Sequence, residues 1–152
     1  MEEHIERAQD ELKRVDHLVY VSLKYTRTVD VLLNTVNRMI DAYEAMFKAL
    51  LQKKVDEQKI PEIPETPVQR ANKVSELYQG NDEVQDNVDL FLLLRKLNKA
   101  EDVEKEEEYR RHVTMRTTIE GREEVLNIDI VSKYYDFQKE FFREVKDITG
   151  FE

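Results

Sequence analysis

Apolar residues recur every three or four positions along the first half of the chain, which is the spacing of one face of an α-helix. This face comprises Ile5, Ala8, Leu12, Val15, Val19, Val29, Leu33, Val36, Ile40, Tyr43, Phe47 and Leu50. A second row widens the apolar stripe and comprises Leu18, Tyr25, Leu32, Met39 and Met46. A stripe this wide exceeds the seam of a two-stranded coiled coil and needs several neighbouring helices, so it predicts a helical bundle.

Polar and β-branched residues interrupt the stripe at positions 25–28. Two interpretations follow from this break. The segment is either one continuous coiled-coil helix of about 45 residues or two antiparallel helices that turn at the break. We favour the antiparallel pair, because the wide stripe requires neighbours on more than one side.

The three prolines lie within seven residues, at Pro61, Pro64 and Pro67. They predict a stiff, extended, proline-rich connection over residues 55–66. The next helix is expected to start directly after it. Thr66 can cap that helix, Pro67 suits its first position, and Gln69 stands where a capping box requires it.

Gly80 is expected to end this helix, and Asn81 or Asp82 to cap the next one, over residues 82–99. Residues 91–94 of that helix are apolar on all sides, which indicates burial and a subunit interface. The acidic run 101–108 that follows reads as a solvated loop or a frayed helix end.

Residues 111–129 change the hydrophobic period from about 3.6 to 2, which predicts a β-hairpin. A two-residue turn at Glu120 and Gly121 pairs Met115 with Leu126 and Thr114 with Asn127, and it also sets Val113 opposite Ile128 and His112 opposite Asp129. Glu is not favoured at the first turn position, so a register different by one or two residues stays open. The last helix, over residues 130–148, is expected to bury Ile130, Tyr134, Phe137, Phe141, Val145 and Ile148.

Composition supports this architecture. Only 3 Gly and 3 Pro occur in 152 residues, too few turn residues for a sandwich or barrel, whereas the 40% of hydrophobic residues suffices for one core. The predicted fold is therefore mainly α. It is a single domain, 1–152, built as an antiparallel bundle of four to five helices with one β-hairpin inserted near residues 111–129.

The chain has no cysteine, which excludes disulfides and zinc–thiolate sites. Its charged N-terminus does not resemble a signal peptide, and no apolar run approaches the ~20 residues of a membrane span. We therefore expect a cytoplasmic protein without a membrane-embedded part, and the heavy charge is compatible with a thermophilic source. The net charge of −9 disfavours broad capture of nucleic acid, although a local basic patch would still permit it.

One basic cluster stands out as a candidate ligand site: Tyr109, Arg110, Arg111, His112 and Arg116. Guanidinium groups hold phosphates and a phenol ring stacks on a base, so this cluster fits RNA or a nucleotide. The alternative is structural: Arg110 and Arg111 neutralise the adjacent acidic run, and His112 pairs with Asp129. The sequence has no glycine-rich phosphate loop and no His-Glu-x-x-His motif, so we expect neither cofactor nor metal.

Residues 42–51 read AYEAMFKALL. This segment resembles the AYYAMFHAARALL-like helix of HEPN domains, which are small helical bundles often found beside nucleotidyltransferases. The order of elements is similar too. The resemblance implies a homodimer, a nucleotidyltransferase-type partner protein and, in catalytic members, a metal-independent ribonuclease site with an Arg followed four to six residues later by a His. That Arg–His pattern is absent here.

Three hypotheses follow. The first is a non-enzymatic, homodimeric HEPN-like module that binds a protein or RNA partner. The second is a metal-independent ribonuclease with a rearranged site, in which His112 acts as acid–base and Arg95, Arg110 or Arg111 holds the scissile phosphate. The third is a structural subunit of a larger helical assembly.

Overall fold

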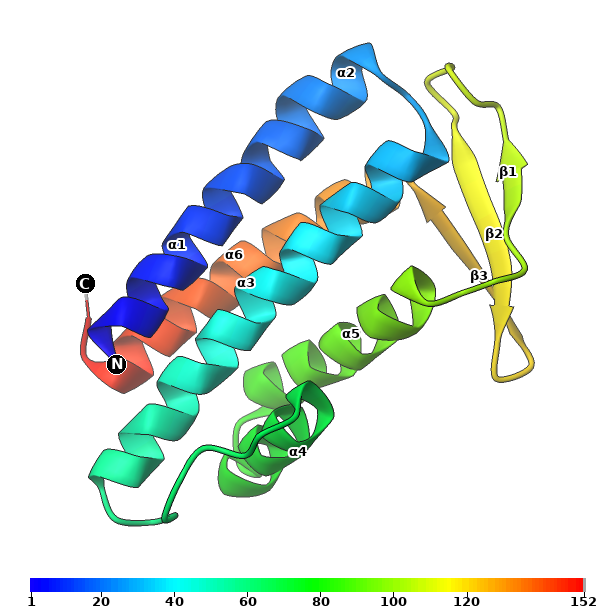
Figure 1. Cartoon of the computed structure of the whole chain (residues 1–152). Helices are drawn as coiled ribbons and strands as arrows, with labels where there is room; N and C mark the ends of the chain where they lie inside the picture. The colour runs from blue at the N-terminus through cyan, green and yellow to red at the C-terminus, as the bar shows by residue number, and fades with distance from the viewer. Residues whose placement is uncertain (152) are drawn as a thin grey trace.

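Long helices that pack around a central one make up most of the computed structural model, which describes residues 1–151, and a small sheet lies at one side (Figure 1). In chain order the elements are α1 (Glu2–His17), the π-helical segment η1 (Leu18–Ser22), α2 (Leu23–Tyr25), α3 (Val29–Asp56), α4 (Pro67–Leu77), α5 (Asp82–Asn98), β1 (Glu104–Glu106), β2 (Thr114–Ile119), β3 (Arg122–Asn127) and α6 (Ile128–Thr149). The prediction of a mainly α bundle with an inserted hairpin is confirmed.

The break in the apolar stripe is a turn between two antiparallel helices. α1, η1 and α2 form one continuous rod that ends at Tyr25, and α3 starts at Val29 and runs back alongside it (Figure 1). The Thr28 hydroxyl accepts a hydrogen bond from the Val31 backbone N–H at 3.2 Å and so caps α3. The continuous coiled-coil interpretation is therefore wrong.

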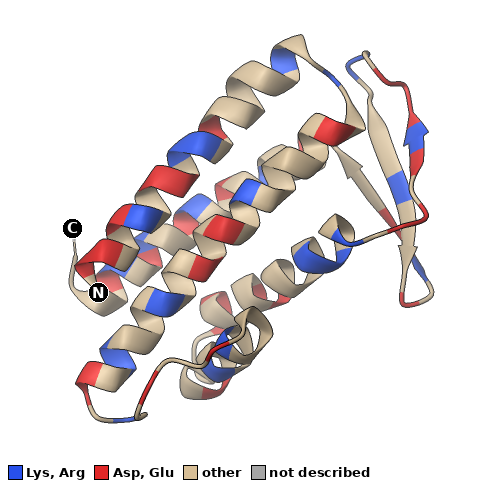
Figure 2. Ribbon diagram, in the orientation of Figure 1, with Lys and Arg blue, Asp and Glu red and all other residues tan. Residues whose placement is uncertain are grey.

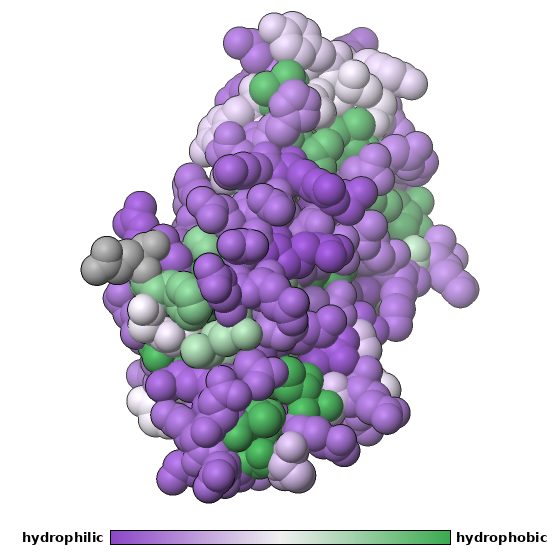
Figure 3. Space-filling view, turned by 60° about the vertical axis from the view of Figure 1, so that its left-hand side comes forward, coloured by the Kyte–Doolittle hydropathy of each residue, from purple (hydrophilic) through white to green (hydrophobic). Residues whose placement is uncertain are grey.

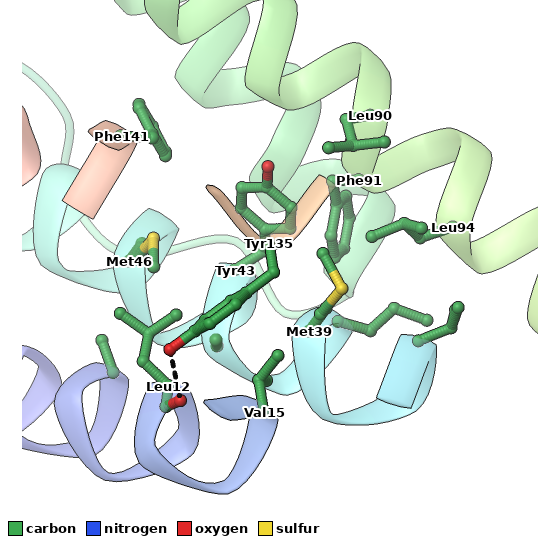
Figure 4. Packing of buried hydrophobic residues seen from close by; sticks show 14 of the residues in the cluster. Leu12, Val15, Met39, Tyr43, Met46, Leu90, Phe91, Leu94, Tyr135 and Phe141 are labelled. Atoms are coloured by element: carbon green, nitrogen blue, oxygen red, sulfur yellow. Dashed lines mark hydrogen bonds between the residues drawn. The ribbon is translucent and has the colours of Figure 1, made fainter. Parts of the chain in front are cut away.

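The core lies around α3, which contacts α1, α4, α5 and α6. Tyr43 and Phe47 of α3 meet Phe91 of α5 and Phe141 of α6, with ring centroids 5.1 to 6.3 Å apart. Figure 4 shows Tyr43 near Met39 and Met46 of α3 and Phe91 of α5. Its buried hydroxyl donates to Asn87 Oδ1 at 2.6 Å, which satisfies both polar groups inside the core.

The caps predicted for α4 and α5 are present. Thr66 and Gln69 form a reciprocal capping box at the start of α4. Asn81, the first of the two candidates for α5, accepts from the Val84 N–H at 3.1 Å. Residues 57–66 connect α3 and α4 and contain Pro61 and Pro64. The three prolines therefore correctly predicted a connection between two helices here.

Two predicted apolar faces need correction. α6 buries Val131, Tyr135, Gln138, Phe141, Phe142 and Val145, whereas Tyr134 is half-buried and Phe137 is exposed. The face is displaced because Gln138 donates to the Met39 carbonyl at 2.8 Å, and a satisfied polar group can occupy a core position. Tyr25, assigned to the second apolar row, is 78% exposed at the end of α2.

The apolar side chains of residues 91–94 pack largely against the core of the same chain. Phe91 and Leu94 are fully buried, and Leu92 and Leu93 are half-buried against the core. The bundle itself therefore accounts for most of the apolar excess that suggested a subunit interface. Dimerisation stays a prediction.

The hairpin has the expected register, with Thr114 opposite Asn127 and Met115 opposite Leu126. Glu120 and Gly121, both with positive φ, form its two-residue turn. The pairs expected further along, His112 with Asp129 and Val113 with Ile128, do not form, because Asn127 caps α6 and the chain turns helical at Ile128.

A third strand was not predicted. Residues 104–106 of the acidic run, expected to be a loop or frayed helix, pair antiparallel with β2 and give the sheet order β1-β2-β3. The sheet covers one end of the bundle through Val113, Met115 and Leu126, all fully buried. Within residues 1–151, no helix is long and apolar enough to cross a membrane.

Candidate functional site

The loop between β1 and β2 is fixed to the turn between α2 and α3, although about eighty residues of chain separate them. Glu108 Oε2 accepts the Val29 backbone N–H at 3.0 Å. The next residue, Tyr109, donates its backbone N–H to the Arg27 carbonyl at 2.6 Å. These two bonds hold the loop against the start of α3, where Figure 1 shows it beside the upper end of the helical hairpin.

The loop backbone is strained at this contact. Glu107 and Tyr109 have φ values of +55° and +67°, in the left-handed region that side chains with a Cβ rarely adopt. Such residues persist only where surrounding contacts impose the conformation, and they cluster at ligand sites. Here the Glu108 and Tyr109 hydrogen bonds impose it.

Aromatic side chains project from this end of the bundle. We call the surface formed by Tyr20, Val21, Tyr25, Tyr109, Arg110 and Arg111 the tyrosine–arginine end. Tyr25 and Tyr109 are each 78% exposed, and Tyr20 is 53% exposed. Four of the six exposed large hydrophobic residues described lie here. Figure 3 shows a paler surface with green patches at the height of η1 and α2, above a strongly hydrophilic middle. Exposed apolar groups gathered in one place indicate an interaction site.

Several cations in or next to the tyrosine–arginine end have no acidic partner among residues 1–151. Lys24, Arg110 and Arg111 are exposed, and none has an ion pair within 4 Å among residues 1–151. Arg27 adds a half-buried guanidinium whose Nε has no hydrogen-bond partner in the same residues. Figure 2 shows blue segments on both the α2 end and the facing loop.

Within residues 1–151, the acidic run forms no ion pair with Arg110 or Arg111. Glu106 pairs with Arg116 at 2.6 Å, and Glu108 is engaged by the Val29 N–H. Lys105, inside the run, reaches Asp30 at 3.6 Å. Glu106 and Glu108 are thus engaged elsewhere, and both interpretations of Arg110 and Arg111 stay predictions.

Arg116 is separated from the other candidates. Its guanidinium bonds Glu106 on β1 and Glu123 on β3, at 2.6 and 3.0 Å. The hydrogen bond and charge of Glu106 raise the pKa of Arg116 above its usual value. With its donors committed across the sheet, Arg116 ties the three strands together and is not placed to hold a ligand at the tyrosine–arginine end.

His112 is exposed beside Asp129 but forms no ion pair with it within 4 Å in the described residues. Together with Arg111 and Asp129 it lines a hollow of only about 50 Å³. That volume accommodates a water molecule or two and no substrate.

Arg95 lies far from His112. It sits near the end of α5 with its guanidinium 5.8 Å from the Phe91 ring centroid. The adjacent Lys96 bonds Glu120 at the hairpin turn, whereas His112 precedes the other end of β2. Six strand residues separate these ends, or about 20 Å. Arg95 is therefore not brought to His112, whereas Arg110 and Arg111 directly precede it in the chain.

No metal centre is evident. Residues 1–151 contain no group of three or more His, Asp or Glu side chains arranged to hold a metal ion. His4 lies in an open hollow between α1 and α3, where burial and the nearby N-terminal ammonium group lower its pKa.

Sequence reasoning found Tyr109, Arg110 and Arg111 but missed Tyr20, Tyr25 and Lys24. The sequence held a signal for Tyr25. The apolar stripe stops at positions 25–28 while a tyrosine remains there, which marks an aromatic residue at a turn rather than in the core.

Comparison of the chain with family models, curated proteins and solved structures finds no match.

Proposed function

We propose that this chain is a non-enzymatic, HEPN-like helical module that binds single-stranded RNA at its tyrosine–arginine end. One observation carries the proposal: exposed tyrosines and unpaired arginines occupy the same end of a protein whose net charge is −9. An exposed aromatic ring next to unpaired cations is the combination that holds single strands.

Each component has a distinct role. Tyr25 and Tyr109 offer ring faces on which bases stack, worth about 1–3 kcal/mol per base. Arg110 and Arg111 offer paired donors that match phosphate oxygens. The net charge of −9 disfavours binding of RNA over the whole surface, so binding depends on local groups of cations.

The absence of catalysis is part of the proposal. Acid–base cleavage needs a proton acceptor within hydrogen-bond reach of the attacking hydroxyl and a cation on the same phosphate. Arg95 is about 20 Å from His112 along the hairpin, and the hollow that His112 and Arg111 line has only about 50 Å³. The distant Arg95 and the small hollow favour binding without cleavage.

The HEPN resemblance further supports a homodimer and a nucleotidyltransferase-type partner protein. Leu92 and Leu93, the half-buried members of the α5 run, would contribute to the dimer contact. Light scattering at micromolar concentration should give twice the chain mass of 18.2 kDa. A mass equal to a single chain would contradict dimerisation while leaving RNA binding standing.

The RNA proposal is tested with a fluorescent four-nucleotide RNA of mixed sequence, in low salt and without metal. Fluorescence anisotropy should show saturable binding. The double variant Arg110→Gln/Arg111→Gln should bind at least about tenfold more weakly, because a hydrogen bond to a charged group is worth about 1.5–3 kcal/mol. The control Lys59→Gln/Lys73→Gln removes the same charge at the α3–α4 side and should bind like the wild type.

Two results would overturn the proposal. If the RNA is cut, and His112→Ala stops the cutting, the chain is a ribonuclease. If no RNA binds and the arginine variant behaves like its control, the exposed tyrosines serve a protein partner instead.

A further inference from the structure

A second basic surface lies along the bundle, in the groove between α1 and α6. The groove has a volume of about 380 Å³ and is lined on its α6 side by Lys139, Arg143 and Lys146, and on its α1 side by Lys13. Leu12 and Phe142 supply an apolar floor. The lining residues include four cations and one carboxylate, Asp16, and two further carboxylates, Asp136 and Glu140, pair with Lys139 and Arg143 beside the groove. The strip keeps a small net positive charge on an acidic protein.

The cations of the groove are positioned by the fold. Lys139 Nζ lies 4.6 Å from the Tyr135 ring centroid, and Lys146 Nζ lies 5.2 Å from that of Phe142. Cation–π contacts of this kind hold an ammonium group at the groove edge. The spacing 139, 143, 146 places the three α6 cations on one helix face.

Two of the four groove cations have no acidic partner among residues 1–151, and the other two are in exposed ion pairs. Lys13 and Lys146 have no ion pair within 4 Å among residues 1–151. Lys139 pairs with Asp136 at 3.3 Å and Arg143 pairs with Glu140 at 3.1 Å. Because these four side chains are 41–73% exposed, the two pairs contribute little. Asp16 already accepts the Tyr135 hydroxyl at 2.9 Å.

The other side of α1 has the opposite charge. The hollow between α1 and α3, about 520 Å³, is lined by five carboxylates, among them Glu3, Asp10 and Asp41, and by only two cations, Arg7 and Lys48. Helix α1 therefore divides an acidic groove from a basic one. A polyanion that follows the bundle is restricted to the α6 side.

Tyr20 connects the groove to the tyrosine–arginine end. Its ring packs edge-on against Tyr135 with centroids 6.3 Å apart, yet 53% of the residue remains exposed. Tyr135 lines the groove, and Tyr20 belongs to the end surface. Lys146 and the 107–113 loop lie toward opposite ends of α6, whose 22 residues span about 33 Å.

We propose that a single-stranded RNA held at the tyrosine–arginine end continues past Tyr20 into the α1–α6 groove, where Lys13, Lys139, Arg143 and Lys146 bind its phosphates. The inference rests on the proposed function and extends it from a local contact to a defined strand path. The apolar floor at Leu12 and Phe142 receives a base, and the acidic α1–α3 side excludes the alternative route.

The test compares a four-nucleotide and a sixteen-nucleotide RNA, each titrated into the wild type and into Lys139→Gln/Arg143→Gln/Lys146→Gln. The wild type should bind the longer RNA at least tenfold more tightly. The groove variant should lose that advantage while its affinity for the short RNA stays unchanged, which also shows that it is folded. For the long RNA, the slope of the logarithm of the binding constant against the logarithm of the salt concentration should become shallower by about 0.7 per lost phosphate contact, or by about 2 for the three substitutions.

The control variant Lys53→Gln/Lys59→Gln/Lys73→Gln carries the same charge change on the α3–α4 side and should retain the preference for the longer RNA. If the groove variant keeps that preference, or the control loses it equally, the strand path is wrong. If the short RNA binds but length adds nothing to the wild type, this inference fails and the proposed function stands. If neither RNA binds, both fail.

Discussion

The Glu108 carboxylate caps helix α3 from a loop 79 residues away, by accepting the Val29 backbone N–H at 3.0 Å. The first N–H groups of a helix lack partners within it, and its N-terminus carries partial positive charge, so a carboxylate there stabilises the helix. Thr28 caps the same helix locally through the Val31 N–H. Glu108 therefore couples the conformation of the 107–113 loop to the start of the central helix.

Replacing Glu108 with alanine should lower the free energy of unfolding by about 0.5–2 kcal/mol, the usual worth of a helix cap. Urea denaturation followed by circular dichroism measures it. Glu107→Ala is the matched control, because Glu107 is exposed and has the same charge. Equal stability of the two variants would show that the Glu108 bond contributes nothing in solution.

Tyr78 should make the protein sensitive to alkali. Its hydroxyl donates to the Leu50 carbonyl at 3.1 Å, and burial, with the charge of Glu57, raises the pKa of Tyr78 to about 12. Because the unfolded chain ionises near pH 10, the contribution of this group is complete below pH 10 and is lost as the pH rises from about 10 to about 12.

Urea midpoints measured between pH 8 and pH 12 should therefore decline less steeply in Tyr78→Phe than in the wild type. Tyr25→Phe, which changes a tyrosine that is 78% exposed, should leave the decline unaltered. Burial also raises the pKa values of Tyr43 and Tyr135, so the Tyr78 variant keeps part of the decline. An identical pH profile in all three proteins would contradict the assignment.

The substitution Gly121→Ala in the hairpin turn should lower the free energy of unfolding. The φ of Gly121 is +80°, a conformation that costs residues with a Cβ about 1–2 kcal/mol. No atom lies within 4 Å of an added Cβ, so the cost is backbone strain alone. Gly80→Ala meets neither a positive φ nor a neighbour and should change the unfolding free energy by less than about 0.5 kcal/mol. Urea denaturation compares the two variants. If Gly121→Ala is as stable as Gly80→Ala or more stable, the turn geometry is contradicted.

Tyr109→Ala should weaken binding of the four-nucleotide RNA by about 5- to 150-fold, the equivalent of the 1–3 kcal/mol of one stacked base. Tyr109→Phe keeps the ring and should bind nearly as well as the wild type. Competition anisotropy at constant salt compares the three proteins. If the phenylalanine variant is as weak as the alanine variant, the ring does not act by stacking.

Local signals predicted the framework well. The capping box at Thr66, the cap at Asn81 and the register of Met115 opposite Leu126 all depend on residues close in sequence or on strict alternation. Such patterns act over a few residues, and here the tertiary structure agrees with them. The three residues of β1 were too few and too charged to show alternation, so that strand was missed.

The site was only half predictable because tertiary contacts assemble it. Arg110 and Arg111 were visible as a basic cluster, but their freedom from the acidic run depends on Arg116 engaging Glu106 across the sheet. Their neighbours on α2 come from the other end of the sequence, joined through the bond from Tyr109 to Arg27. On α6, counting apolar residues placed Phe137 inside, because a pattern of apolarity cannot show that Gln138 finds a buried acceptor.

The most direct test of RNA binding at the tyrosine–arginine end is an NMR titration of the ¹⁵N-labelled chain with the four-nucleotide RNA. Amide shifts should concentrate in residues 20–28 and 107–113, with those of Arg27 and Tyr109 among the largest, while α4 stays unchanged. A titration that leaves both segments unperturbed, or that moves only amides elsewhere in the bundle, would contradict the assignment of this surface.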